Sequence, residues 1–198
     1  MTAKVLLVCL GYLAGSIPFG VVLGRLVAGV DVRTVGSGNI GASNVARAAG
    51  KGTGIVVLLL DALKAVLPML ATRAILAPDP SANTWATLVG LAAFLGHIFP
   101  VWLGFKGGKG VATALGVFAV LAPLPTVLAV GAFAVAFALT RVPAVGSLAG
   151  TAVCTAGVFA IYGGRSVVAW AALVVAVLVV WRHRSNLARL RKGAENKV

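Results

Sequence analysis

Residue types that bind phosphate gather in two glycine-rich segments of this sequence, residues 36–52 and 104–110. The first reads "GSGNIGASNVARAAGKG" and the second "GFKGGKG". Glycines let backbone N–H groups converge on an anion, a helix N-terminus adds positive potential, and an arginine can hold phosphate through two N–H groups. We therefore expect two anion-binding loops for two phosphate-bearing groups, with these candidate side chains: Ser37, Ser43, Asn44, Arg47, Lys106 and Lys109.

The same segments partly match two nucleotide-binding motifs. "GSGNIG" satisfies G-x-G-x-x-G, and Asp61 follows Gly41 by 20 residues. However, Asp61 lies in the apolar run "IVVLLLDALKAVL", which is typical of a membrane helix and not of a second strand. "GFKGGKG" lacks the earlier glycine and the Ser/Thr of a Walker A loop. The membrane-helix context excludes a dinucleotide-binding unit at the first segment, and the missing residues exclude a Walker A loop at the second. For both segments one alternative stays open: the glycines only make tight turns, and the basic residues only set the membrane topology.

Histidine is scarce, and each of the two histidines has both a structural and a functional interpretation. His183 and Asn186 are three residues apart, so they share a face if a helix continues through them. His97 follows Gly96 near "FP". No Ser/His/Asp triad and no His-x4-Asp motif can be assembled. An enzyme with these residues would work mainly by binding anions and aligning reactants.

Acidic side chains and thiols are too few and too scattered for a metal centre or a disulfide. Carboxylate-based metal sites and zinc sites need clustered ligands, and lone cysteines within apolar runs are usually small buried hydrophobes. We expect no metal and no cofactor. The residues concerned are Asp31, Asp61, Asp79, Glu195, Cys9 and Cys154.

The elements that must position these loops are membrane helices. The chain is 60% hydrophobic and only 11% charged, whereas roughly a quarter of the residues of a soluble protein are charged. Apolar runs of about 20 residues span a bilayer. We predict a single all-α polytopic membrane domain over residues 1–198. A cleaved signal peptide is disfavoured, because the first apolar run continues through "IPFGVVLGRLVAGV".

About seven membrane helices are expected, two of them short. Between Lys109 and Arg141, Pro123 and Pro125 exclude one straight helix and favour two short segments that enter and return. The other helices are expected at about residues 4–29, 54–76, 84–103, 143–161 and 166–182.

Charge predicts the orientation of these helices. The net charge is +13, and the basic residues stand at the ends of apolar runs, which fits topology and lipid or phosphate contacts better than nucleic acid. The turn "PDPSAN" has no basic residue. The positive-inside rule then places the N-terminus outside and both glycine-rich loops and the C-terminus in the cytoplasm. Asp61 and Lys64 are spaced to pair within a helix, either structurally or near the site.

Three motifs together resemble one family. "GSGNIGASNVARAAGKGTG", "GHIFPVWLGFKGGKGVAT" and "HRSNLARLRKGAENK" are similar to the three signatures of the bacterial membrane acyl-phosphate:glycerol-3-phosphate acyltransferases, in order and over the whole chain. The resemblance implies transfer of an acyl chain from acyl phosphate to the sn-1 hydroxyl of glycerol 3-phosphate, giving lysophosphatidic acid and phosphate in the bacterial inner membrane. Membrane lipids are implied as surroundings, with no obligatory protein partner.

The resemblance also assigns roles residue by residue. Ser37, Arg47, Lys106 and Lys109 resemble ligands of the glycerol 3-phosphate phosphate group, and Gly41, Ala42, Ser43 and Asn44 resemble the acyl-phosphate pocket. Ser147, His183 and Asn186 resemble the catalytic groups that orient the acceptor hydroxyls. The chain departs from the pattern at Ile40, where proline is common, and at Ser43, where threonine is common.

The chemistry leaves one choice open. Acyl phosphate carries a good leaving group, so direct attack by the acceptor hydroxyl needs no acyl-enzyme, and the proton can pass to the donor phosphate or to His183. A phosphate-ester transporter is the rival from another class, but no inverted repeat is visible and the basic loops gather on one face. A membrane scaffold would leave the glycine-rich loops unexplained.

Overall fold

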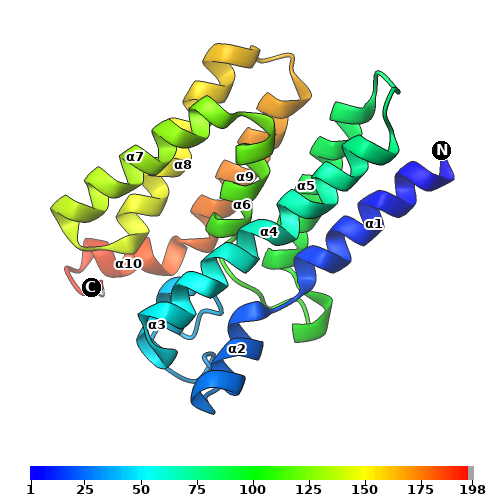
Figure 1. Ribbon diagram of the computed structural model, residues 1–198. Coiled ribbons are helices and arrows are strands. Elements are labelled where there is room, and N and C mark those ends of the chain that lie inside the picture. The colour runs from blue at the N-terminus through cyan, green and yellow to red at the C-terminus, as the bar shows by residue number, and fades with distance from the viewer. Residues whose placement is uncertain (196–198) are drawn as a thin grey trace. The chain divides into compact units, whose positions relative to one another are not determined.

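The computed structural model describes residues 1–195, in which every regular element is a helix (Figure 1). Two compact units divide the chain, Met1–Val120 and Leu121 onward. In chain order the elements are α1 (Thr2–Ser16), α2 (Phe19–Ala28), α3 (Ala42–Ala49), α4 (Lys51–Ile75), α5 (Ala82–Ile98), the short 3-10 helix η1 (Val101–Leu103), α6 (Val111–Leu121), α7 (Pro123–Thr140), α8 (Pro143–Tyr162), α9 (Val167–Arg182) and α10 (Arg184–Arg191).

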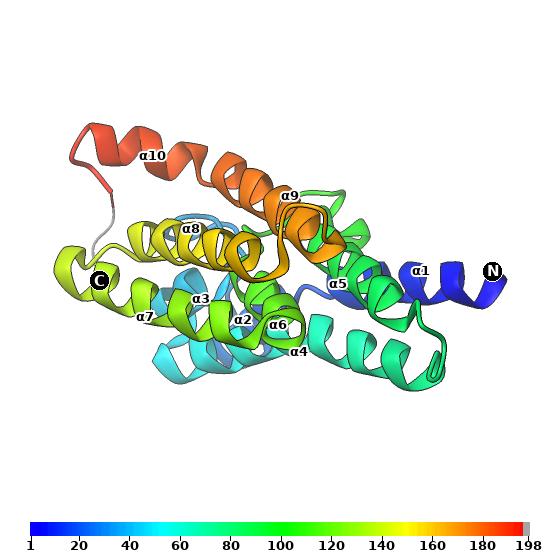
Figure 2. The same cartoon turned by 90° about the horizontal axis from the view of Figure 1, so that it is seen from above.

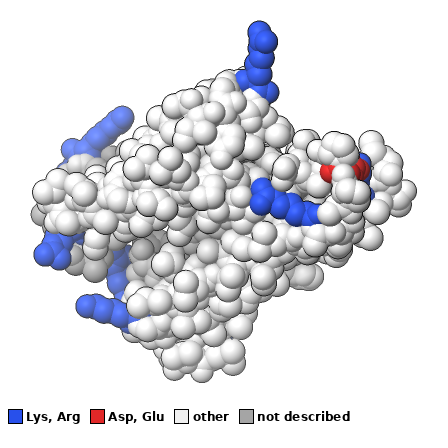
Figure 3. All heavy atoms as spheres, turned by 45° about the horizontal axis from the view of Figure 1, so that its top comes forward, with Lys and Arg blue, Asp and Glu red and all other residues white. Residues whose placement is uncertain are grey.

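The helices confirm a polytopic membrane protein. Within the described residues, five spans are long and apolar enough to cross a membrane, or six if the bent pair α9–α10 counts as one. Leucine and isoleucine side chains such as Ile55, Leu59 and Leu67 are exposed along α4, as a lipid-facing surface requires. On the face shown in Figure 3, most of the surface is uncharged and basic side chains stand at isolated points.

Close helix contacts build the first unit. α1 packs along α5, and α4 packs against both helices. A Cβ on Gly15 would overlap the backbone of Ala93, and a Cβ on Gly96 would overlap the backbone of Tyr12. Small residues at such crossings let membrane helices approach closely, and this packing fixes the end of α5 that leads into the second glycine-rich segment.

Two local features of the first unit differ from the sequence prediction. The expected first helix is broken at Ile17–Pro18 into α1 and α2, because proline lacks the N–H that would continue the helix. The glycine-rich segment is not all loop, since residues 42–49 form α3. α3 packs against α4 and α2, so the segment has a helical support of its own.

The second unit consists of α7, α8, α9 and α10. The predicted interruption before Pro123 is confirmed, and Pro123 occupies the first turn of α7, where its missing N–H costs nothing. α6 is short as expected, with 11 residues, but α7 has 18 and meets the length of a span. α7 packs on α8, and α8 packs on α9. α10 follows α9 after a bend of 53°. Figure 2 shows the two helices end to end, with α10 leading to the C-terminus.

Candidate functional site

Asn44 holds the first glycine-rich loop in shape. Its side chain is buried, its Oδ1 accepts the N–H of Ser37 at 2.8 Å, and its Nδ2 donates to the carbonyls of Val32 at 2.7 Å and Val35 at 3.1 Å. A Cβ on Gly36 would overlap this amide, and the φ of +58° at Gly36 is one that residues with a Cβ rarely adopt. Glycine is therefore required here on both grounds. The sequence suggested the Asn44 side chain as an anion ligand, but its amide is used inside the loop.

The N-terminus of α3 presents two backbone donors. Gly41 is the N-cap, and its own N–H donates to Asn39 Oδ1 at 2.8 Å. The N–H of Asn44 donates to the Gly41 carbonyl at 3.0 Å. Among residues 1–195, the N–H groups of Ala42 and Ser43 therefore have no hydrogen-bond partner, as expected for the first turn of a helix. A helix end with such open donors is suited to an anion.

Four polar side chains among the predicted site residues of the two glycine-rich segments are exposed: Ser37, Ser43, Arg47 and Lys106. Ser43 and Arg47 are four residues apart on α3 and share its exposed face. Ser37 is exposed on the loop before the helix, and Lys106 is exposed in the second segment. In the part of the chain that the structure describes, the Ser37 hydroxyl, the Arg47 guanidinium and the Lys106 ammonium have no hydrogen-bond or ion-pair partner.

The second glycine-rich segment folds back onto the end of α5. The N–H of Gly107 donates to the Ile98 carbonyl and that of Gly108 donates to the His97 carbonyl, both at 3.1 Å. A Cβ on Gly107 would overlap the His97 carbonyl, and one on Gly108 would overlap the His97 ring. The two glycines are therefore required by packing, and they fix the positions of the lysines on either side, Lys106 and Lys109.

The two glycine-rich segments share a small hydrophobic core in the first unit. Leu103 of η1, just before the second segment, packs against a buried cluster under the first segment that consists of Val21, Val32, Ile40, Val45 and Val57. Ile40, where the family pattern has proline, is thus a core residue. The shared core places the two predicted anion-binding loops in one neighbourhood.

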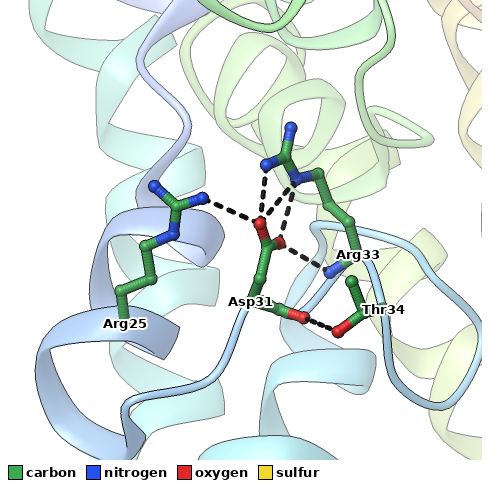
Figure 4. A network of polar contacts seen from close by, with 4 residues as sticks. All are labelled: Arg25, Asp31, Arg33 and Thr34. Atoms are coloured by element: carbon green, nitrogen blue, oxygen red, sulfur yellow. Dashed lines mark hydrogen bonds and ion pairs between the residues drawn. The ribbon is translucent and has the colours of Figure 1, made fainter.

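Asp31 holds together the segment that leads into the first glycine-rich loop. Asp31 contacts Arg33 at 2.6 Å and Arg25 at 2.8 Å, and the Thr34 hydroxyl donates to the Asp31 carbonyl (Figure 4). The Arg33 guanidinium and backbone N–H hold the pKa of Asp31 well below its usual range, so the carboxylate stays ionised. The network leaves an excess of positive charge beside the first loop.

His183 and Asn186 lie in the second unit, at the bend between α9 and α10. His183 Nδ1 lies 2.8 Å from the Val179 carbonyl. A carbonyl only accepts, so Nδ1 carries a proton, and Nε2 carries the lone pair when the ring is neutral. Asn186 Nδ2 donates to Glu195 Oε1 at 2.8 Å. Asn186 Oδ1 is buried and has no hydrogen-bond partner within residues 1–195.

Ser147 also lies in the second unit, on α8, which packs against α9. Its hydroxyl donates to the Pro143 carbonyl at 2.8 Å, which leaves the oxygen as an acceptor. The predicted site residues thus form two groups: those of the first unit near the shared core, and these three in the second unit. The last two residues of the third motif, Asn196 and Lys197, lie outside the described residues.

A buried cluster of charged and polar side chains was predicted from the sequence only in part: the Asp61–Lys64 pair was expected, and the contact with His97 was not. The expected pair is confirmed, with Lys64 Nζ 2.8 Å from Asp61 Oδ1, both side chains buried. His97 completes the cluster, with Nδ1 2.8 Å from Lys64 Nζ. Local spacing reveals the first contact, but nothing in the sequence pairs residues 64 and 97. The described residues contain no cluster of His, Cys, Asp or Glu that could hold a metal ion.

Comparisons with known proteins agree on one family. Residues 5–193 match the family model described as glycerol-3-phosphate acyltransferase. A glycerol-3-phosphate acyltransferase of Anaeromyxobacter sp. (strain K) is 63% identical over 193 residues, covering 98% of this chain and 96% of the relative. One from Geobacter sulfurreducens is 46% identical over 197 residues, covering 100% and 98%.

Two solved structures match over nearly the whole chain. Both are crystal structures of PlsY (YgiH), an integral membrane glycerol 3-phosphate acyltransferase. The glycerol 3-phosphate form is 40% identical with a TM-score of 0.90, covering 99% of this chain and 96% of that one. The lysophosphatidic acid form is 39% identical with a TM-score of 0.87, covering 98% and 95%. The chain is therefore an all-α, multi-pass integral membrane enzyme that belongs to the glycerol-3-phosphate acyltransferase family.

Proposed function

We propose that this acyltransferase takes its acyl chain from acyl phosphate and transfers it to the sn-1 hydroxyl of glycerol 3-phosphate. The products are lysophosphatidic acid and inorganic phosphate, the first step of phospholipid synthesis. The observation that carries the proposal is that both glycine-rich segments border one hydrophobic core, so that their exposed basic side chains and the open N–H groups of α3 could together hold the phosphates of donor and acceptor. The first loop matches a dinucleotide motif only in spacing, because a membrane helix follows it in place of a second strand, and the second loop lacks residues of a Walker A motif. Both points argue against a nucleotide-linked acyl donor.

The acceptor phosphate is proposed to bind Ser37, Arg47, Lys106 and Lys109. Arg47 offers a planar fork for two phosphate oxygens, and the serine hydroxyl adds a neutral donor. The exposed and unpartnered side chains of Ser37, Arg47 and Lys106 support this assignment, since their donors are free for a ligand. The two homologous structures are described as the glycerol 3-phosphate form and the lysophosphatidic acid form, and each of these compounds carries a phosphate group on glycerol.

The donor phosphate is proposed to bind at the N-terminus of α3, formed by Gly41, Ala42, Ser43 and Asn44. The open N–H groups of Ala42 and Ser43 would donate to phosphate oxygens, and the Ser43 hydroxyl would add a third donor. Gly41 and Asn44 contribute differently, because their own hydrogen bonds keep the turn in shape. Membrane lipids would surround the acyl chain.

Ser147, His183 and Asn186 are proposed to orient the acceptor hydroxyls. The buried Asn186 Oδ1 would accept a hydrogen bond from a glycerol hydroxyl, which would give this acceptor the partner it lacks in the described chain. Ser147 Oγ can accept in the same way. Because Val179 fixes the His183 tautomer, Nε2 is the ring atom that would accept a hydroxyl proton or its hydrogen bond.

The reaction is proposed to proceed by direct attack. The sn-1 oxygen forms an ester bond with the acyl carbon, the bond from that carbon to the phosphate oxygen breaks, and phosphate leaves. The hydroxyl proton passes to an oxygen of the donor phosphate, with His183 Nε2 as the competing base. Bound anions and fixed geometry would supply most of the rate enhancement, and no metal or cofactor would be required.

The enzyme is proposed to lie in the bacterial inner membrane with its N-terminus outside and its C-terminus in the cytoplasm. The basic residues of both loops and of α10 support this orientation, because basic residues favour the cytoplasmic side. Both phosphate sites would then face the cytoplasm. No other protein is needed for the chemistry proposed.

The test supplies purified protein with glycerol 3-phosphate and either palmitoyl phosphate or palmitoyl-CoA. We expect lysophosphatidic acid and inorganic phosphate in equal amounts from palmitoyl phosphate, and little product from palmitoyl-CoA. Arg47→Ala should abolish most of the activity, whereas the matched control Arg165→Ala, on the turn between α8 and α9, should not. Efficient use of palmitoyl-CoA without phosphate release would overturn the proposed donor.

A further inference from the structure

Lys64 is a buried ammonium that contacts three different parts of the first unit. Its Nζ contacts three acceptors: Asp61 Oδ1 at 2.8 Å, His97 Nδ1 at 2.8 Å and the Ile17 carbonyl at 3.2 Å. The contact with Asp61 is an ion pair, and those with His97 and the Ile17 carbonyl are hydrogen bonds. The three partners come from α4, from α5 and from the break between α1 and α2. A single charge thus joins three elements of the first unit.

The hydrogen bond from Lys64 to His97 connects the cluster to the second predicted anion-binding loop. Because the ammonium donates to His97 Nδ1, the ring proton of His97 is on Nε2, the atom that faces Gly108. The backbone carbonyls of His97 and Ile98 accept the N–H groups of Gly108 and Gly107. A shift of the His97 ring or backbone would therefore shift the glycines that lie between Lys106 and Lys109.

The hydrogen bond from Lys64 to the Ile17 carbonyl connects the cluster to the first predicted anion-binding loop. The Ile17 carbonyl precedes Pro18, where the helix is broken, and Lys64 supplies it with a donor. α2 begins at Phe19, and its Gly20 lies so close to the Ile40 carbonyl that a Cβ would overlap it. Ile40 is the residue before Gly41, the N-cap of α3. A shift of the break at Pro18 would therefore move α2, and the close contact of Gly20 with Ile40 would move the first loop with it.

A buried charge pair is a costly way to obtain stability alone. Two ions lose their hydration when they are buried, and replacing such a pair with well-packed apolar residues is often neutral or stabilising. In a membrane protein, an ionisable residue inside a span is by default a candidate for function. Lys64 also hydrogen-bonds His97 of α5 and the Ile17 carbonyl between α1 and α2, and an apolar pair could not make these two bonds.

We propose that Lys64 is a positioning residue that sets the two phosphate-binding loops relative to each other. Under the proposed function, on which this inference rests, the acceptor phosphate is held by Ser37 and Arg47 from one loop and by Lys106 from the other. The spacing of the loops therefore determines acceptor affinity. Loss of the ammonium should raise KM for glycerol 3-phosphate much more than it lowers kcat, although Lys64 itself touches no substrate.

The main test is the double variant Asp61→Leu/Lys64→Met, which removes both charges together and leaves no unpaired buried ion. We expect KM for glycerol 3-phosphate to rise about tenfold or more, with kcat changed less and with thermal unfolding in detergent near that of the wild type. Asp61→Asn keeps the ammonium and its bonds to His97 and Ile17, so its KM should rise less than that of the double variant.

A matched control uses another lysine–aspartate pair of the same unit. Lys4 and Asp79 lie 2.6 Å apart, between α1 and the turn that joins α4 to α5. The double variant Lys4→Met/Asp79→Asn should leave KM unchanged. If it raises KM as much as Asp61→Leu/Lys64→Met does, the effect is one of general charge loss and the positioning role is refuted.

Two His97 variants keep the inference testable if the double variant does not fold. His97→Asn retains an acceptor oxygen that can replace Nδ1, whereas His97→Leu does not. KM should rise less in His97→Asn than in His97→Leu, and equal values would overturn the role of Lys64. Wild-type protein tested with acyl phosphate separates the two proposals: its inactivity would refute the proposed donor, whereas wild-type activity with an unchanged KM in the Asp61→Leu/Lys64→Met variant would refute only the positioning role.

Discussion

At the residue scale, charge alone does not explain why an arginine stands on α3. Arg47 is exposed, shares a face with Ser43 and has no ion-pair partner among the described residues. Lysine at this position would keep the charge but lose the planar fork that binds two phosphate oxygens. The shape of the guanidinium is therefore the property to test.

Arg47→Lys should lower kcat/KM for glycerol 3-phosphate by about 10- to 100-fold, the range expected for one lost charge-assisted hydrogen bond. Steady-state kinetics on protein with an unchanged unfolding temperature measures this loss. Near-wild-type kinetics would remove Arg47 from the phosphate site.

His183 offers a second test at this scale, since its ring can orient the acceptor or take its proton. With the donor phosphate as proton acceptor, His183→Ala should mainly weaken acceptor binding, and the pH–rate profile should keep its shape. This is the outcome that we expect. If His183 is the base, kcat should fall by about 10²–10⁴-fold and a pKa near 6–7 should vanish from the profile. That second result would refute the substrate-assisted mechanism and leave the activity assigned.

At the element scale, the first glycine-rich loop depends on one amide. Asn44 bonds three backbone groups across twelve residues of chain, and these bonds leave the first turn of α3 open to a ligand. Glycines alone would permit many conformations of this segment, and the amide selects one of them.

Asn44→Asp should damage the loop although the two side chains have nearly the same shape. A carboxylate can still accept the Ser37 N–H, but it cannot donate to the carbonyls of Val32 and Val35, and leaving such groups unpaired costs about 1–3 kcal/mol each. We expect a lower unfolding temperature and a loss of activity of at least about tenfold. The control is Asn83→Asp, an exposed residue at the start of α5, which should be near neutral in both assays. Equal behaviour of the two variants would contradict the role of Asn44.

At the scale of the whole molecule, the placement of basic residues predicts which segments face the cytoplasm. Positions 37, 109 and 192 should be cytoplasmic and position 83 external. Single cysteines at these positions, in a C9A/C154A background, can be labelled in intact cells with an impermeant reagent. We expect labelling at position 83 only. Ready external labelling of a cysteine at position 109 would overturn the orientation.

The background variant and a chelator test the chemistry of the whole enzyme. Catalysis by anion binding needs neither a thiol nor a metal, and the described residues hold no ligand cluster. The C9A/C154A protein should therefore keep most of its activity, and EDTA should not inhibit the wild type. Loss of activity in EDTA that added Mg²⁺ restores would show that a metal takes part.

The membrane class, most of the helices and the family could be predicted from the sequence alone. Apolar runs long enough to span a bilayer leave few alternatives to helices, since lipid offers the backbone no hydrogen bonds. Pro123 marked a helix start correctly, because the ring acts on the local backbone whatever surrounds it. The i,i+3 pair of Asp61 and Lys64 was equally local. These features depend on neighbours in the chain, and a sequence displays such neighbours directly.

Which polar groups already have partners in the fold depends on contacts between segments far apart in the chain. Nothing local shows that the Asn44 amide serves Val32 and Val35, that Val179 fixes the tautomer of His183, or that Lys64 reaches His97. Each of these bonds depends on how the backbone turns or packs between the partners. A buried polar group must find a partner wherever the fold brings one near. Sequence patterns therefore identified the candidate residues, whereas packing showed which of their polar groups already have partners in the fold.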